Sequence, residues 1–228
     1  ALQHQGQPSL RRELFSMLGL LYKDFYTSKK ELMLTGFMAL LFVVFNVATD
    51  QAEMLGPSIG VLISVGSLVP TYSIHYDKTN GWDKFICASP ISRKQVVLSK
   101  YLAGLITIVV INLVIVVDNM AVGSPIPVWG YAALLCMTLF LQAVMLPVCL
   151  KLGQNFVVAV FLIVVFLPIG ALFFLNRVNI LTDAAIEGAF DFIQQNAASL
   201  SLLGIVVTVV LYAISFLISL QYYKHMEM

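Results

Sequence analysis

Long apolar stretches separated by short polar segments dominate the hydrophobic pattern of the chain. A helix needs about 20 apolar residues to cross roughly 30 Å of hydrocarbon, and six stretches meet or approach that length. The pattern predicts an all-α membrane protein with six transmembrane helices in one domain over residues 17–228. The expected spans are Glu31–Ala48, Met54–Ile74, Tyr101–Met120, Val128–Leu150, Phe156–Leu175 and Leu200–Tyr222.

The composition supports a membrane protein. Hydrophobic residues make up 60% of the chain and charged residues 11%, whereas soluble domains carry about 25% charged residues. So few charges cannot cover a water-facing surface, and the lipid bilayer is therefore an expected partner. A net charge of +1 gives no reason to expect nucleic acid as a partner.

The positions of the basic residues predict the orientation of the spans. If the chain crosses the membrane six times, all but one of the 13 Lys and Arg residues fall on the same side, and the exception is Arg177. Lys and Arg are retained on the cytoplasmic side of a membrane. Both termini are therefore expected in the cytoplasm.

Two segments precede the first expected span. Residues 1–16 are polar and lack the apolar core of a secretory signal, so we expect a disordered tail or a tag remnant. In Leu18–Lys30, apolar and basic residues recur at helical spacing, which indicates an amphipathic elbow helix in the membrane interface. A plain cytoplasmic extension of the first span is the alternative. The elbow residues are Leu21, Tyr22, Lys23, Phe25 and Tyr26.

The segment 77–100 is the longest polar connection expected on the cytoplasmic side. Trp82, Phe85 and Ile86 follow the spacing i, i+3, i+4 and predict an apolar ridge on a short helix. Ser89 and Pro90 are expected to begin a second helix that continues into the third span. The ridge could rest on lipid headgroups or dock into a soluble protein, since an exposed apolar patch is costly without a partner.

The spans contain few reactive groups. HExxH and CxxC motifs are missing from the sequence, so we expect neither catalytic residues nor a metal site, and no enzyme activity. The notable polar side chains within the spans either bond across helices or line a conduit, and they provide no obvious site for a coupling ion. These residues are Asn46, Asn112, Asp118 and Gln142.

Two strings carry a family resemblance over the region from Met17 to the C-terminus. The elbow string LLYKDFYTSKKEL and the more specific string WDKF…SPISRKQVVLSKYL resemble the ABC type-two permease superfamily. The nearest resemblance is to short bacterial permeases that lack an ATPase domain. Such permeases lie in the bacterial cytoplasmic membrane as multi-pass proteins.

The resemblance implies roles for particular segments. The helix at Trp82–Ala88 would be the coupling helix that docks on the nucleotide-binding subunit, and 176–198 would be the outer connection before the last span. No Walker A loop is present, so ATP and magnesium would bind a separate ATPase subunit. The expected coupling residues are Trp82, Asp83, Lys84, Phe85, Ile86, Arg93 and Lys94.

The resemblance also implies an assembly and a cargo. Two ATPase subunits would bind two permease copies, as a homodimer or a related heterodimer. The chain is similar to permeases that export phenol-soluble modulins or confer immunity to peptide antibiotics, so an amphipathic peptide is the expected cargo. The alternatives are a non-transporting membrane partner or immunity protein, or an exporter of a lipid-like or drug cargo.

Overall fold

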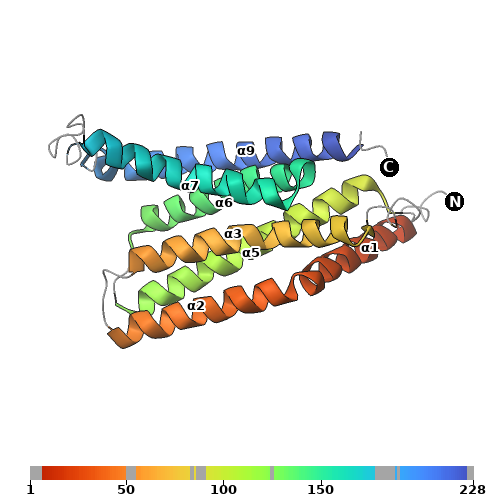
Figure 1. Ribbon diagram of the computed structural model, residues 1–228, viewed down its shortest axis with the longest axis horizontal. Coiled ribbons are helices and arrows are strands. Elements are labelled where there is room, and N and C mark those ends of the chain that lie inside the picture. Colours follow the sequence, from red (N-terminus) through yellow and green to blue (C-terminus); the bar gives the residue numbers. More distant parts are fainter. Residues whose placement is uncertain are drawn as a thin grey trace.

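The computed structural model describes residues 7–49, 55–82, 85, 91–123, 126–177, 188 and 191–224. The elements of this part of the chain are helices that lie lengthwise beside one another in a bundle (Figure 1). This confirms the all-α class. The helices are α1 (Gln7–Thr27), α2 (Lys29–Thr49), α3 (Leu55–Thr79), α5 (Arg93–Ala121), α6 (Val128–Leu152), α7 (Gln154–Arg177) and α9 (Ala197–Lys224).

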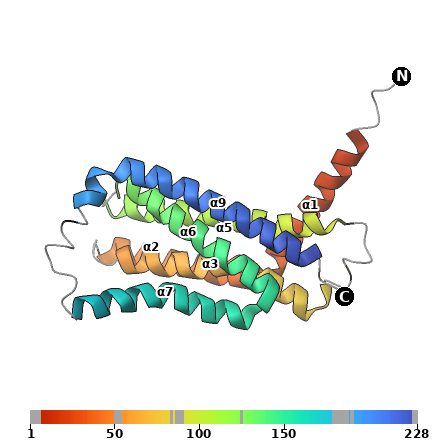
Figure 2. The ribbon, with the colours of Figure 1, turned by 90° about the horizontal axis from the view of Figure 1, so that it is seen from above.

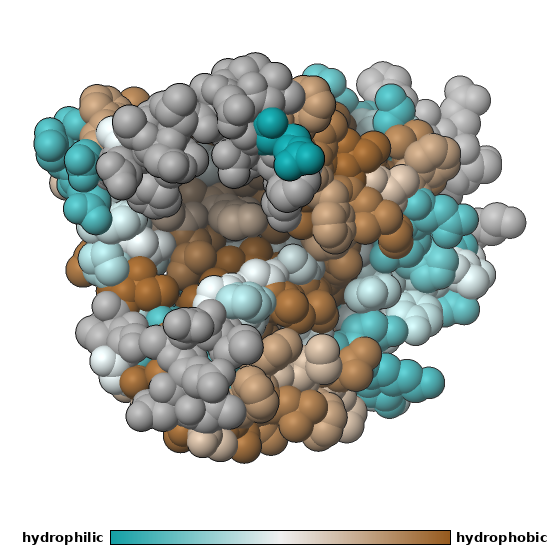
Figure 3. Space-filling view, turned by 60° about the vertical axis from the view of Figure 1, so that its left-hand side comes forward, coloured by the Kyte–Doolittle hydropathy of each residue, from teal (hydrophilic) through white to brown (hydrophobic). Residues whose placement is uncertain are grey.

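Most of these helices have the length and composition of membrane spans. Among the described residues, five helices are long and apolar enough to cross a bilayer, namely α2, α3, α5, α6 and α9. Within α7, the shorter apolar stretch Gln154–Pro168 qualifies as an apolar helix. On the face seen in Figure 3, hydrophobic residues cover much of the middle of the bundle, while hydrophilic residues gather toward its ends. The count of six spans stays a prediction.

The bundle interior is formed mainly by α3, α5 and α6, with α9 packed along α6. One cluster of buried residues joins α1, α3, α5, α6 and α9, and includes Leu20, Ile74 and Tyr101. A second cluster joins α3, α5 and α6 through Ile63 and Ile115. The helices are therefore held by apolar packing along their length, as the roughly continuous hydrophobicity of each span requires.

Close helix approach occurs at glycines other than those expected. In the sequence, Gly56, Gly60 and Ser64 at four-residue spacing predict close packing against a neighbouring helix, yet a Cβ at either glycine would meet no atom within 4 Å. A Cβ on Gly66 would instead lie 1.8 Å from Ile111 Cδ1, and one on Gly104 would lie 2.6 Å from Gln142 Oε1. The face of α3 with Gly66 meets α5, whereas the face with Gly60 is exposed.

Helix α1 begins at Gln7, earlier than the expected start at Leu18. It bends away from the axis of α2 at Ser28 (Figure 2), which favours an elbow over a straight extension of the first span. The start of α1 and the end of α9 lie at the same end of the bundle (Figure 1). Below, this is called the α1 end.

Candidate functional site

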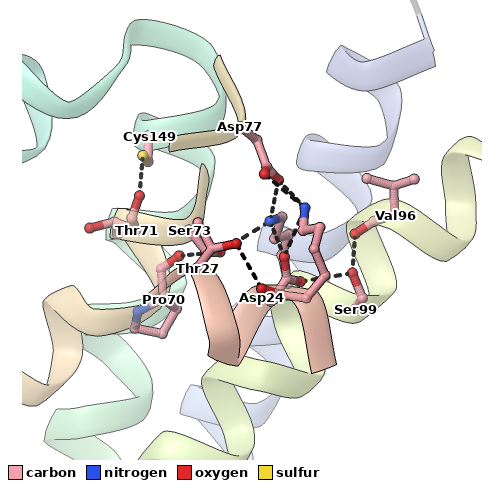
Figure 4. A network of polar contacts seen from close by, with 11 residues as sticks. Asp24, Thr27, Pro70, Thr71, Ser73, Asp77, Val96, Ser99 and Cys149 are labelled. Atoms are coloured by element: carbon pink, nitrogen blue, oxygen red, sulfur yellow. Dashed lines mark hydrogen bonds and ion pairs between the residues drawn. The ribbon is translucent and has the colours of Figure 1, made fainter. Parts of the chain in front are cut away.

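Four charged side chains from three helices meet at the α1 end of the bundle. Lys100 on α5 places its Nζ 2.5 Å from Asp24 Oδ1 on α1 and 2.5 Å from Asp77 Oδ2 on α3. Lys23 Nζ lies 2.7 Å from both carboxylate oxygens of Asp77 and 3.2 Å from Asp24 Oδ1. Figure 4 shows the Asp24 and Asp77 carboxylates converging on this network. We call these four residues the ion-pair cluster.

The ion-pair cluster is nearly sealed from solvent. Asp24 is 2% exposed, Lys100 3% and Asp77 7%. Two lysines and two aspartates cancel in charge, so each buried ion has an opposite partner, which a buried ion needs to be tolerated. Ser99 Oγ donates to Asp24 Oδ2 at 3.1 Å, and Lys100 also donates to Ser73 Oγ at 3.1 Å. These bonds supply further partners for the buried charges.

Lys23 is the most accessible member of the ion-pair cluster. Its side chain is 21% exposed. Burial lowers the pKa of Lys23 below its ordinary value, and the neighbouring charge of Lys100 acts in the same direction. The carboxylates of Asp24 and Asp77 oppose this effect. Lys23 thus joins the buried charges to the surface of the bundle.

The sequence did not reveal the ion-pair cluster. Leu20 and Asp24 on α1, and Ser28 just after its end, are buried at four-residue spacing and form the face that packs against the bundle. Tyr22 and Tyr26 point outward instead, with their rings stacked at 6.2 Å. The detectable signal was the single acid of the expected elbow helix Leu18–Lys30, which lies among basic and aromatic residues and in isolation is typical of a water-facing position.

The expected coupling ridge lies directly beside the ion-pair cluster. Lys23 Nζ is 4.7 Å from the centroid of the Trp82 ring, and the Trp82 and Phe85 rings are 5.0 Å apart. Trp82 is partly buried against the core, whereas Phe85 is 60% exposed. The structure therefore brings Trp82 and Phe85 together and presents Phe85 at the surface. Asp83, Lys84 and Ile86 lie outside the described residues.

The helix after this ridge begins later than expected. We predicted that Ser89 and Pro90, which lie outside the described residues, begin this helix, but α5 begins at Arg93 with Ser92 as the cap. Ser92 Oγ accepts a hydrogen bond from the Gln95 backbone, and the Gln95 side chain bonds the Ser92 backbone in return. This reciprocal capping box satisfies two free backbone donors and fixes the helix start.

Two cations on either side of the coupling ridge, Lys78 and Arg93, attach the segment 77–100 to other helices. Lys78 Nζ, near the end of α3, donates to the carbonyls of Cys149 and Leu150 at the end of α6, at 2.9 and 2.5 Å. Arg93 Nη1 donates to the carbonyls of Tyr223 and Lys224 at the end of α9, at 3.3 and 2.8 Å. Cations at helix C-termini also interact favourably with the helix dipole.

The residues at the border of α5 differ in their surroundings. Arg93 is half-buried and its guanidinium is engaged by α9, whereas Lys94, the next residue, is exposed. The sequence grouped the two as equivalent coupling residues. In the structure, Lys94 faces outward from the start of α5, while Arg93 ties α5 to α9.

The polar residues expected along a conduit separate into three places. Asn46 Nδ2 donates to Asp118 Oδ2 at 2.8 Å and to Ser58 Oγ at 3.0 Å, which joins α2, α3 and α5. Asn112 donates to Thr138 on α6. Gln142 is fully buried beside Gly104. Three of these hydrogen bonds cross between helices, as one of the two interpretations of the sequence expected.

The described residues contain no group of three or more His, Cys, Asp or Glu side chains that could hold a metal ion. The site's chemistry therefore consists of buried ion pairs, a partly exposed aromatic pair and cations on helix ends. Such groups can transmit force or bind a protein partner.

Comparison with known proteins gives a family for the chain. The model of a family described as "ABC-2 family transporter protein" matches residues 19–224. The match includes the ion-pair cluster, the Trp82–Phe85 pair and both helix-end contacts. Among curated proteins, none matches the sequence.

Proposed function

The chain belongs to the ABC-2 family of transporters as a multi-pass transmembrane subunit, and we propose that it forms the membrane part of an ATP-driven exporter. An ABC ATPase partner follows from this family. In the proposed complex, two ATPase subunits bind two permease copies at the α1 end. The observation that carries the proposal is the exposed Phe85, which lies against Trp82 at the edge of the ion-pair cluster.

In this proposal the α1 end faces the cytoplasm of a bacterial cell. The support is the distribution of Lys and Arg, which places all but one of these 13 residues on that side of a six-span topology. The ATPase subunit holds ATP and magnesium. An interfacial position of α1, with Tyr22 and Tyr26 exposed, would fit the same orientation.

Movement of the segment 77–100, docked on the ATPase, would be transmitted to several helices at once. This segment continues directly from α3 and leads into α5. Lys78 and Arg93 attach its borders to the ends of α6 and α9, and Lys23 attaches Trp82 to α1. When ATP draws the two ATPase subunits together, we expect these helices to tilt as a unit. ATP can shift the equilibrium only by its greater affinity for the closed state.

The proposed cargo is an amphipathic peptide, such as a toxin or an antimicrobial peptide. Support for the cargo comes from the sequence resemblance and from the apolar character of the spans, which suits a molecule that enters from the membrane. Asn46, Asn112, Asp118 and Gln142 remain the proposed polar positions near a conduit. The two-copy assembly would place that conduit between the permease subunits.

The test compares two phenylalanines that are equally exposed. Phe85 and Phe166 are each 60% exposed, but Phe166 lies on α7. Loss of an aromatic anchor at an interface costs about 2 kcal/mol or more, so Phe85→Ala should weaken ATPase binding about thirtyfold. Phe166→Ala should leave it unchanged. The measurement is ATPase retained by the purified permease in detergent, followed by peptide export in proteoliposomes.

Three results would count against parts of this proposal. If Phe85→Ala retains both ATPase and transport, the aromatic pair rests on lipid and is not the docking element. If the ATPase binds but no candidate peptide is exported, a non-transporting partner or immunity protein is favoured. If a lipid or drug is exported instead, the transporter assignment stands and the peptide cargo is wrong.

A further inference from the structure

A continuous apolar groove runs between α2 and α5. A cavity of about 130 Å³ lies at its end nearest α1, and its lining includes Phe25, Leu32 and Ile106. This cavity shares Gly36, Ala39, Val110 and Val114 with a wider hollow of about 480 Å³, which reaches Val43 and Val117. The shared lining makes the two hollows one groove along the bundle.

The lining favours an apolar occupant. Among the described residues that line the groove, only Thr35 and Thr107 have polar side chains. Thr35 donates to the Glu31 carbonyl at 2.8 Å and Thr107 to the Ala103 carbonyl at 2.9 Å, each within its own helix. Neither hydroxyl is directed to a ligand. The groove therefore fits a hydrocarbon chain better than a polar molecule.

A lysine lies at the head of this apolar surface. Lys29, Leu32, Gly36, Ala39 and Val43 follow the spacing 3, 4, 3, 4 and so share one face of α2. Lys29 is exposed, with its Nζ 4.2 Å from the Tyr26 ring. The rise from Lys29 to Val43 is about 21 Å, which exceeds the roughly 15 Å half-thickness of a bilayer core. The cation can therefore lie at headgroup depth while the groove lies in hydrocarbon.

We propose that this groove binds one anionic phospholipid, with an acyl chain between α2 and α5 and the phosphate at Lys29. The inference rests on the proposed orientation, in which the α1 end lies at the inner leaflet. A second protein copy would cover the groove with apolar side chains but would leave Lys29 needing an acid. A phospholipid supplies both the hydrocarbon and the anion. The bound lipid would lie against the bend between α1 and α2.

The chain offers matched variants for both halves of the site. Lys29→Gln removes the charge, and Lys30→Gln is its control because Lys30 is also exposed but lies off the groove face of α2. Gly36→Leu fills the groove without a clash, since a Cβ there meets no atom within 4 Å. Gly60→Leu is its control, because Gly60 is equally open on α3 but does not line the groove.

The measurement is native mass spectrometry of the purified transporter with added phosphatidylglycerol or phosphatidylcholine of the same acyl chains. We expect one tightly bound phosphatidylglycerol per copy. Lys29→Gln should weaken phosphatidylglycerol about fivefold, the effect of one basic residue near anionic lipid, and leave phosphatidylcholine unchanged. Gly36→Leu should abolish tight binding of both lipids. The two control variants should behave like the wild type.

Other outcomes would overturn the inference. Equal effects of Lys29→Gln and Lys30→Gln would show diffuse surface attraction rather than a site. Unchanged lipid binding by Gly36→Leu would place the lipid elsewhere, and loss of permease pairing in this variant would identify the groove as an interface between copies. ATPase retention is measured in the same samples. In the wild type, a lack of lipid binding with intact ATPase retention would contradict the lipid site but not the proposed exporter function. Intact lipid binding without ATPase retention would contradict the exporter function but not the lipid site.

Discussion

Neutralising a single member of the ion-pair cluster should strongly destabilise the protein. Neutralising two members of opposite charge together should cost less than the sum of the two single losses. Lys100→Gln leaves two carboxylates with only Lys23, and Asp24→Asn leaves two lysines with only Asp77. Either change creates a net charge in a site where Asp24 and Lys100 are at most 3% exposed. Loss of one partner of a buried ion pair costs about 3–5 kcal/mol.

The double variant restores neutrality. With Asn at position 24 and Gln at position 100, Lys23 still pairs with Asp77 at 2.7 Å, and the new amides can bond each other. The double variant should therefore lose less than the sum of the single variants. Coupling energies for residues in one network reach about 0.5–3 kcal/mol, and direct contact between these two side chains places the expected value in the upper half of that range.

The assay is reversible unfolding of the purified protein by SDS in mixed micelles, followed by circular dichroism. Lys94→Gln is the control, since Lys94 is exposed at the start of the same helix, and surface substitutions change stability by about 0.5 kcal/mol or less. Strictly additive losses would refute direct coupling between Asp24 and Lys100. Single losses below about 1 kcal/mol would show that water reaches the ion-pair cluster and screens it.

Three further predictions follow from individual contacts. Arg93→Gln should lower transport at unchanged ATPase retention, because it breaks hydrogen bonds to the end of α9. Lys94→Gln should instead lower ATPase retention. The opposite pattern would make Arg93 the docking residue and Lys94 the transmitting one. Asp118→Asn keeps an acceptor for Asn46 on α2 and should change the free energy of unfolding by less than about 1 kcal/mol. Asp118→Leu removes that acceptor and should cost about 1–3 kcal/mol. Loss of transport in Asp118→Asn while the ATPase stays stimulated would instead indicate ion coupling. Gly66→Ala should cost about 1–3 kcal/mol because its Cβ meets Ile111 Cδ1. Ile111→Ala alone should cost about 2–5 kcal/mol through the cavity it leaves, and the double variant should lose less than the sum of the two single losses in the same unfolding assay. Two fully additive losses would contradict the clash.

The helices could be predicted from the sequence because the bilayer imposes a simple requirement. A spanning segment must satisfy its backbone internally and present apolar side chains, so long hydrophobic runs identify α2, α3, α5, α6 and α9. The pairing of Trp82 with Phe85 was also predictable, since residues three apart on a helix share a face. Both inferences depend on residues near one another in the chain.

The ion-pair cluster could not be predicted in this way. Asp24 and Lys100 are 76 positions apart, and each residue alone resembles a solvated charge beside an apolar run. Their burial depends on how α1 and α5 pack, which hydrophobic periodicity does not specify. Similarly, the open surface of Gly60 and the close contact at Gly66 are equivalent in sequence, and only the packing of α3 against α5 distinguishes them.

The contacts of Lys78 and Arg93 have a consequence for tolerance to mutation. Both cations bind main-chain oxygens at the ends of α6 and α9, and every amino acid supplies such an oxygen. Exchanging the side chains at those two helix ends should therefore leave the anchorage in place, provided that the helices end where they do now. Only Lys78 and Arg93 contribute side chains to these contacts. Related permeases could therefore vary freely at the ends of α6 and α9, but hardly at all at positions 78 and 93.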